Sequence, residues 1–148
     1  MKIIAIQGPN MNRLGVREPE RYGTRTLAEV QASMDEKAAE LGASVEHFQS
    51  NSEGALIDWV QERQDAADGV ICNPAGLTNY GLSLRDALKE TLLPVAIVHV
   101  TTLFNREPWR LDDKFGEVAS SGYICGIGWH GYLTAVEALV RRHAEPKR

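Results

Sequence analysis

The sequence predicts an α/β protein with a doubly wound, five-stranded parallel sheet and helices on both faces of that sheet. Five short apolar runs alternate with segments whose apolar residues recur at helical spacing, which is the pattern of repeated strand and helix units. The apolar runs contain little polar alternation, as expected for parallel strands that are covered on both sides. The chain has 148 residues and no internal repeat or linker, so we expect one domain over residues 1–148.

The first strand is predicted at residues 2–7, and the polar segment Gly8–Gly23 follows it. This segment is too polar and too broken for a core element, and it is long for a connection between a strand and a helix. We therefore expect about fifteen residues without secondary structure that form a functional lid, with a flexible insertion as the alternative. Thr26 to Glu29 has the pattern of a capping box, and the apolar spacing after it predicts a helix that ends at Gly42.

The other elements follow from the same two patterns and from turn chemistry. Ser52 can cap the second helix, and Pro74–Gly81 has the composition of a turn. In chain order, we predict a strand at residues 44–49, a helix after Ser52 with Leu56, Trp59 and Val60 inward, strands at 69–73, 95–100 and 122–127, and helices near 82–91 and 131–143.

Charge and hydropathy exclude several classes of partner. The net charge is −4 and the pI is about 5.6, whereas nucleic acids and membrane surfaces select basic faces. No apolar run approaches membrane-spanning length, and the first residues enter a strand without the pattern of a signal peptide, so we expect a cytoplasmic protein. Cys72 and Cys125 lie in apolar runs and are interpreted as small buried hydrophobic residues. No motif with metal-ligand spacing is found in the sequence.

Polar residues of three loops can converge, because the carboxyl ends of parallel strands share one edge of the sheet. Arg17 and Tyr22 lie in the first loop, where a guanidinium beside a phenol favours the phenolate. Tyr22 can then act as a base, and the alternative is a surface aromatic. His99 ends an apolar strand and is either a hydrogen-bonded core histidine or an active-site acid. The same edge includes Asn10 and the segment from Asn73 to Asn79.

Two further patterns have more than one interpretation. Arg106 and Arg110 follow the fourth strand, where guanidinium groups suit a carboxylate or hydroxyls, although a solvated surface pair is the alternative. Gly126–Gly131 matches the glycine pattern of dinucleotide sites. That pattern belongs in the first strand and helix unit, so we interpret these glycines as aids to close packing of strand and helix.

Together these motifs resemble the type II 3-dehydroquinate dehydratases, a family of small flavodoxin-like enzymes, over nearly the whole chain. The stretches that carry the resemblance are Gly8–Gly23, Gln49–Gly54 with Leu56–Asp58, Leu84–Ala87, Val98–His99, Arg106–Glu107, and Gly126–Gly128 with Gly131–Leu133. The resemblance implies that a proton is removed beside a ring ketone, that an enolate forms, and that a hydroxyl leaves the neighbouring carbon. It implies no metal and no cofactor, and it places the enzyme in the shikimate or quinate pathway.

The resemblance also implies a role for particular residues. Tyr22 is the base, Arg17 favours its ionisation, Asn10 holds the group that stabilises the enolate oxygen, and His99 protonates the departing hydroxyl. Substrate binding is assigned to Asn73, Asn79, the backbone of Val100 with Thr101, Arg110, Arg106 without a specific role, and Asp86.

The family implies an assembly as well as a site. Asp86 matches a residue that the family contributes across a trimer interface, and those trimers build a dodecamer. The expected partners are therefore a small cyclic keto acid as substrate and further copies of the chain, with no nucleic acid and no membrane.

Two positions depart from the family pattern. Asn79 stands where the family usually has His, and Ile97 stands where it usually has Glu, two residues before His99. Alternate residues of a strand share a face, so Ile97 removes the carboxylate that would orient and charge the His99 ring. Three alternatives to 3-dehydroquinate dehydratase therefore stay open. They are a dehydratase or isomerase for a different cyclic ketone, a silent binding or assembly protein, and a flavin or nucleotide module.

Overall fold

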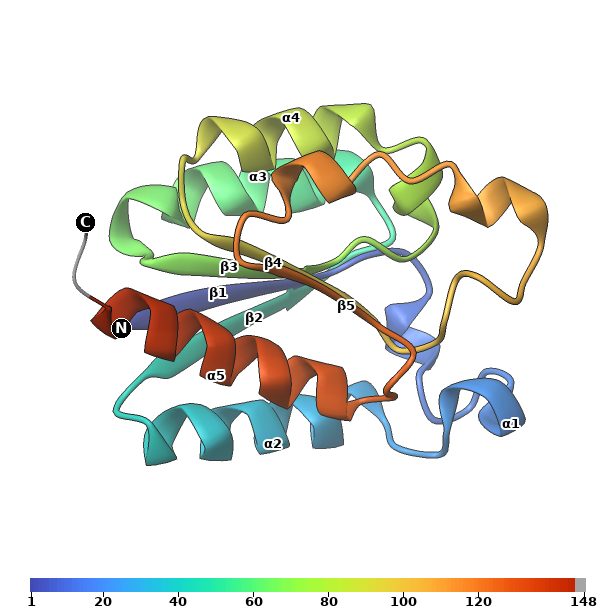
Figure 1. The fold of residues 1–148 in the computed structure, drawn as a ribbon, viewed down its shortest axis with the longest axis horizontal. Coiled ribbons are helices and arrows are strands. Elements are labelled where there is room, and N and C mark those ends of the chain that lie inside the picture. The colour runs from blue at the N-terminus through green and yellow to red at the C-terminus, as the bar shows by residue number, and fades with distance from the viewer. Residues whose placement is uncertain (146–148) are drawn as a thin grey trace.

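The computed structural model describes residues 1–145 and contains a five-stranded, all-parallel sheet (Figure 1). The strand order is β2-β1-β3-β4-β5. This is the flavodoxin-like order of a doubly wound sheet, which reverses direction between β1 and β3. The strands span Lys2–Gln7 (β1), Ser44–Gln49 (β2), Gly69–Asn73 (β3), Val95–His99 (β4) and Gly122–Cys125 (β5).

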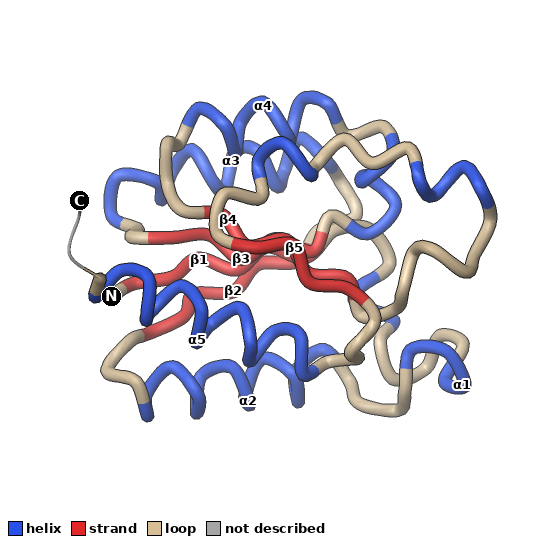
Figure 2. The backbone as a smooth tube through the Cα atoms, in the orientation of Figure 1, coloured by secondary structure: helices blue, strands red, loops and turns tan. Residues whose placement is uncertain are grey.

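Two helices cover each face of the sheet. Helices α2 and α5 lie on one face, and α3 and α4 lie on the other (Figures 1 and 2). Their bounds are Leu27–Glu40 (α2), Glu53–Arg63 (α3), Leu82–Glu90 (α4) and His130–Ala144 (α5). The predicted fold class, its five strands and these four helices are therefore confirmed.

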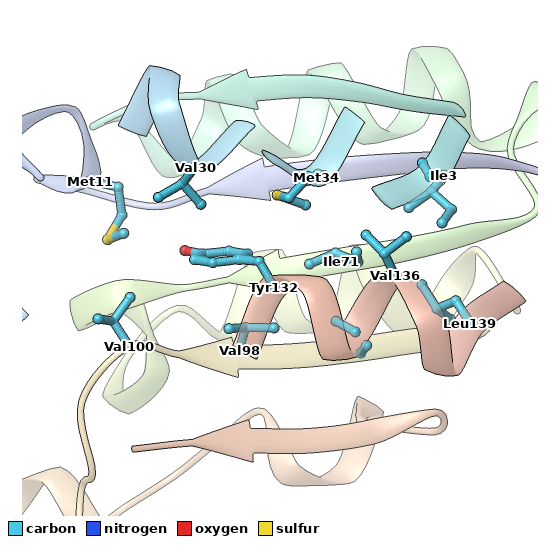
Figure 3. Packing of buried hydrophobic residues seen from close by; sticks show 14 of the residues in the cluster. Ile3, Met11, Val30, Met34, Ile71, Val98, Val100, Tyr132, Val136 and Leu139 are labelled. Atoms are coloured by element: carbon cyan, nitrogen blue, oxygen red, sulfur yellow. The ribbon is translucent and has the colours of Figure 1, made fainter. Parts of the chain in front are cut away.

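Each face of the sheet has its own apolar core. Ile3, Ile71 and Val98 pack under α2 and α5, where Met34 and Val136 are fully buried (Figure 3). The opposite face is filled from alternate strand positions, from α3 and α4, and from the segment between β4 and β5. Its residues include Ile4, Ile6, Leu56, Leu84, Ile97 and Phe115. Both faces bury apolar side chains, which explains why the strands read as continuous apolar runs.

Two predicted helix starts are confirmed in atomic detail. At the start of α2, the Thr26 hydroxyl accepts from the Glu29 amide at 3.3 Å, and the Glu29 carboxylate accepts from the Thr26 amide at 2.7 Å. This is a complete capping box. At the start of α3, Ser52 Oγ accepts from the Ala55 amide at 3.4 Å. These contacts fix where each helix begins after the loop that precedes it.

The segment Gly8–Gly23 differs from the expectation in two ways. It contains a 3₁₀ helix at Met11–Arg13 and a one-turn helix, α1, at Pro19–Tyr22. It also contributes to the core, because Met11 and Leu14 are each only 6% exposed. A single helical turn is too short to give a periodic apolar pattern, so these elements left no signal of the kind that predicted α2.

The start of this segment requires glycine. A Cβ atom on Gly8 would lie 2.4 Å from the carbonyl oxygen of Pro74, so only glycine lets the two loops approach. The Gly8 amide donates to the Asn73 carbonyl at 2.8 Å. The loops after β1 and β3 are thereby held against each other at the point where the strand order reverses.

The two cysteines are free thiols. Cys72 is buried and Cys125 is half-buried, and neither forms a disulfide. The interpretation as a buried hydrophobic residue is confirmed for Cys72, and Cys125 is more exposed than expected. Among residues 1–145, no helix is long and apolar enough to cross a membrane.

Candidate active site

A cavity of about 300 Å³ opens at the carboxyl ends of β1, β3 and β4. In Figure 1 this is the edge of the sheet toward α1. Doubly wound sheets bind ligands at such a switch point, and the volume lies at the lower end of the range for small-molecule sites. The cavity is lined by Asn10, Met11, Arg17, Tyr22, Asn73, Ala75, Gly76, Thr78, Asn79, Tyr80, His99, Val100, Thr101, Leu103, Arg106, Trp109 and Arg110.

Two arginines contact Tyr22, in different ways. Arg106 donates from Nη1 to the phenol oxygen of Tyr22 at 3.1 Å and to Thr101 Oγ1 at 3.2 Å. The guanidinium carbon of Arg17 lies 5.2 Å from the centre of the Tyr22 ring. The sequence assigned no specific role to Arg106, whereas in this structure it is Arg106 that donates a hydrogen bond to the phenol oxygen. Both arginines thus place a positive charge beside the phenol.

His99 is 6% exposed at the end of β4, with the hydroxyl of Thr78 3.2 Å from its Nε2. Burial, and next to it the charge of Arg110, lower the pKa of His99 to about 4. Ile97 lies two residues earlier and is fully buried in the apolar core. A carboxylate beside the ring would raise this pKa, and an isoleucine does not, so free His99 is neutral at pH 7.

Arg110 is held by a carboxylate before any ligand binds. Its Nε donates to Glu107 Oε2 at 2.6 Å, and Arg106 Nε lies 3.6 Å from the same oxygen. The hydrogen bond from Arg110 is the main reason that the pKa of Glu107 falls to about 2. The Arg110 guanidinium therefore has a fixed position on the 3₁₀ helix at Pro108–Leu111.

Asn10 adopts a left-handed backbone conformation, with φ of 69°. Its backbone N–H donates to Asn51 Oδ1 at 2.8 Å. Asparagine tolerates this conformation better than most residues. Asn51 is itself held by Gln49, whose Nε2 donates to its side-chain oxygen at 3.2 Å. The loop after β2 thus fixes the start of the loop that contains Tyr22, a role that the sequence analysis did not assign to Asn51.

Asn79 lines the cavity, but its donors are already used. Nδ2 donates to the carbonyl oxygens of Trp109 and Asp112, each at 3.1 Å. Only the side-chain oxygen of Asn79 remains for a ligand. The predicted hydrogen bond of this amide to a ring hydroxyl is thus left to its oxygen, and the two donated bonds hold the loop that contains Arg110.

The cavity brings together every residue of the predicted site except one. Asp86 lies on the exposed side of α4, where it accepts from Arg85 Nε at 3.0 Å, and it does not line the cavity of the single chain. Thr78 and Trp109 also line the cavity, although neither has a predicted role of its own. Thr78 lies in the segment from Asn73 to Asn79, which the topology of a parallel sheet places at this edge.

The charge of the cavity indicates the kind of ligand that fits. Arg17, Arg106 and Arg110 line it, and no carboxylate does within the described part of the chain. A small anion with several hydroxyls matches three guanidinium groups and the amides of Asn10 and Asn73. Next to the anion site lie a phenol and an imidazole, which are groups suited to proton transfer.

The fold and the cavity define an α/β enzyme with a proton-transfer site at its switch point, and comparison with known proteins gives the family. The model of the family "Dehydroquinase class II" matches residues 1–140. The chain is 50% identical over 140 residues to the 3-dehydroquinate dehydratase of Roseiflexus castenholzii, covering 95% of this chain and 88% of that protein. It is 45% identical to the catabolic 3-dehydroquinase of Aspergillus oryzae, over 91% and 88% of the two chains. The chain belongs to the class II dehydroquinase family.

Solved structures agree with this result. The type II dehydroquinase of Propionibacterium acnes matches with a TM-score of 0.89 and 34% identity, over 95% of this chain and 96% of that one. The enzyme of Butyrivibrio crossotus matches with a TM-score of 0.90 and 36% identity, over 94% and 97%. The recognised resemblance and the flavodoxin-like fold are both confirmed.

Proposed function

We propose that this chain is a 3-dehydroquinate dehydratase, a hydro-lyase that converts 3-dehydroquinate to 3-dehydroshikimate and water. Family membership supports the reaction. The observation in the cavity that carries it is the Tyr22 phenol, held by Arg106 and faced by Arg17, in the same cavity as His99. A base and an acid on one bound ring are what elimination of water requires.

In the first half of the reaction, Tyr22 is the base. Its phenolate oxygen, to which Arg106 donates a hydrogen bond, takes the proton from the carbon beside the ring ketone, and Arg17 lies over the same ring. The electron pair of that C–H bond moves into an enolate. Asn10 holds the group that hydrogen-bonds the enolate oxygen, and it is kept at the loop start by Asn51.

In the second half, the enolate collapses and the C–O bond to the neighbouring hydroxyl breaks. His99 supplies the proton, so the leaving group departs as water. Because its pKa is lowered to about 4, His99 is almost entirely neutral at pH 7 in the free enzyme. The substrate carboxylate, bound by the backbone of Val100 and by Thr101, brings a negative charge that offsets Arg110 and favours the protonated ring.

The remaining polar residues hold the ring. Arg110, which Glu107 positions, binds ring hydroxyls, and the Asn79 oxygen accepts from one of them. Asn73 donates beside the leaving group. Arg106 has two contacts, with Tyr22 and with Thr101, so it links the base to the carboxylate-binding loop.

The direct test mixes purified protein with 3-dehydroquinate and follows the ultraviolet absorbance of the conjugated enone product. Tyr22→Phe should lower the rate by at least about 10³-fold, because the base is gone. Tyr80→Phe is the matched control, since Tyr80 lies on the same cavity but is 65% exposed. Equal activity of wild type and Tyr22→Phe, or no enone from wild type, would contradict the proposal.

A second candidate is an enzyme that forms the enolate on a different cyclic ketone and returns the proton without elimination. The neutral His99 beside Ile97 favours it, because proton abstraction does not need the acid. Exchange of solvent deuterium into a ketone without formation of an enone would support this candidate. A silent binding protein would show neither exchange nor enone.

We further propose that the protein works in the cytoplasm as a homo-oligomer of trimers that assemble to a dodecamer. The oligomer is supported by the family and by Asp86, which has no place in the cavity of its own chain but is exposed on α4. Leu92, at the end of the same helix, is 91% exposed, as expected for a residue that another copy covers. The free thiols of Cys72 and Cys125 fit a reducing compartment.

A further inference from the structure

Three buried polar side chains from three elements meet behind the cavity. Gln7 ends β1, Asn73 ends β3, and the two are paired residues of adjacent strands. Tyr132 reaches them from the first turn of α5. Gln7 and Tyr132 are fully buried and Asn73 is 2% exposed. Only Asn73 lines the cavity, so the other two have no direct contact with a ligand there.

The hydrogen bonds among them run in one direction. Asn73 Nδ2 donates to the Tyr132 hydroxyl oxygen at 2.7 Å, and that hydroxyl donates to Gln7 Oε1 at 2.7 Å. Burial raises the pKa of Tyr132, so its hydroxyl keeps its proton over the working pH range. The oxygen of Asn73 accepts from the Ala75 amide at 3.0 Å. Because a backbone N–H can only donate, this last contact decides which end of the Asn73 amide faces which partner.

Close packing of α5 makes the contact possible. A Cβ atom on Gly131 would lie 3.2 Å from Val98 and 3.3 Å from Ile124, so glycine lets the start of α5 approach the sheet. This supports the packing interpretation of the glycine pattern at Gly126–Gly131. In Figure 3 the Tyr132 ring lies over the sheet, with its oxygen directed toward the end of the core where Met11 lies. Met11 also lines the cavity.

We propose that Tyr132 and Gln7 are positioning residues that fix the Asn73 amide as a hydrogen-bond donor toward the bound substrate. One of the two Asn73 N–H groups is held by Tyr132, and the oxygen is held by Ala75. The second N–H is the only donor of the amide left for the cavity, so it selects an acceptor such as the departing hydroxyl oxygen.

The hydrogen bonding of Gln7 indicates that this residue positions Asn73 and does not mainly stabilise the fold. Its Nε2 is buried without a hydrogen-bond partner among the described residues, which is unfavourable for folding. An apolar residue of similar size would remove that unpaired donor. Gln7 therefore contributes through its oxygen, which orients the Tyr132 hydroxyl and, through it, Asn73.

The inference rests on the proposed function and is tested with a double-mutant cycle. Tyr132→Phe should lower kcat on 3-dehydroquinate about tenfold, the upper end of what one hydrogen bond contributes. In the Asn73→Ala background, the same change should alter kcat by less than about twofold, because Tyr132 acts only through Asn73. A tenfold loss in both backgrounds, or no loss in either, would overturn the inference.

Gln7→Met separates positioning from folding. We expect unchanged or slightly higher thermal stability and a kcat lowered about fivefold. If the Tyr132→Phe protein does not fold, Gln7→Met serves as the test in its place. Leu139→Ala is the matched control, because Leu139 lies in the same core but packs beside Gly69, at the opposite end of β3 from Asn73, and this variant should lower stability with kcat unchanged. A loss of stability without a loss of kcat in Gln7→Met would overturn the inference.

A spectroscopic measurement keeps the inference testable if 3-dehydroquinate is not the substrate. In a ¹⁵N-labelled protein, the Asn73 side-chain amide should give one proton signal that exchanges slowly with water. Tyr132→Phe should make that signal exchange rapidly. An unchanged signal would contradict positioning, whereas absent dehydratase activity with the expected NMR change would contradict only the proposed substrate.

Discussion

At the scale of single residues, the balance of charge around His99 differs from the rest of the site. Arg106 donates a hydrogen bond to the Tyr22 phenol oxygen, whereas burial and Arg110 lower the pKa of His99 to about 4 and so disfavour its charged form. His99 is therefore neutral near pH 7 in the free protein. This leaves the acid dependent on the charge of the bound substrate.

A carboxylate placed two residues before His99 should change this balance. Ile97→Glu should raise the pKa of His99 from about 4 by one unit or more, because alternate strand residues share a face. The sign follows from the attraction between a carboxylate and the protonated ring. An NMR titration of the ring protons measures it, and the alkaline limb of the kcat profile, where the protonated acid is lost, should shift upward with it.

The control for that change is Ile97→Gln, which has similar size and no charge. Ile97 is fully buried, so both substitutions should lower stability by a few kcal/mol. Only the glutamate should raise the His99 pKa. If both variants titrate alike, the electrostatic account of the missing carboxylate is wrong.

At the scale of elements, the sequence predicted best where an element buries a periodic face. The bounds of β2 and β3 match the prediction residue for residue, and α2 has the predicted cap and apolar stripe. The strands β4 and β5 end earlier than predicted, at His99 and Cys125. Apolar residues continue past both ends, and periodicity alone does not show where hydrogen bonding to the neighbouring strand stops.

The sequence predicted which residues line the cavity better than it predicted the hydrogen bonds between their side chains. Residues at strand ends are placed by topology alone, which is why His99 and Asn73 meet as expected. The partners of Asn79 come from residues 30 and 33 positions later, in loops without a periodic pattern. The donation from Arg106 to Tyr22 spans 84 positions. Such side-chain contacts depend on loop conformation, which no pattern in a single sequence encodes.

The contact between Asn79 and the loop of Arg110 yields a prediction for that loop. Asn79→Asp has the same shape but no donors, so it should release the carbonyls of Trp109 and Asp112. We expect faster amide exchange over residues 108–112 and a KM raised about fivefold, with a smaller effect on kcat. Asn79→His keeps a donor and should fall between this variant and wild type. Unchanged exchange in Asn79→Asp would show that the contact does not hold the loop.

At the scale of the whole molecule, the predicted site residues fall into two groups. All but one line a cavity within the single chain, and Asp86 lies outside it. The loops after β1, β3 and β4 meet at the switch point of the sheet and build the cavity from a single chain. Asp86 projects from α4, which packs on the face of the sheet that α3 also covers, away from that cavity. If the residue serves catalysis, it must serve the cavity of another copy.

Mixing two inactive variants tests this arrangement. The Asp86→Asn chain lacks the carboxylate that would reach the cavity of a neighbouring copy. The Tyr22→Phe chain lacks the base of its own cavity. In an oligomer reassembled from equal amounts of both, about a quarter of the sites should combine an intact Tyr22 with an intact Asp86. We therefore expect activity to return to about a quarter of the wild-type level after subunit exchange, measured by enone absorbance. Mixing Asp86→Asn with a double variant that carries both changes is the control and should restore nothing. If the first mixture also stays inactive although mass spectrometry shows mixed oligomers, Asp86 does not act in the cavity of another copy.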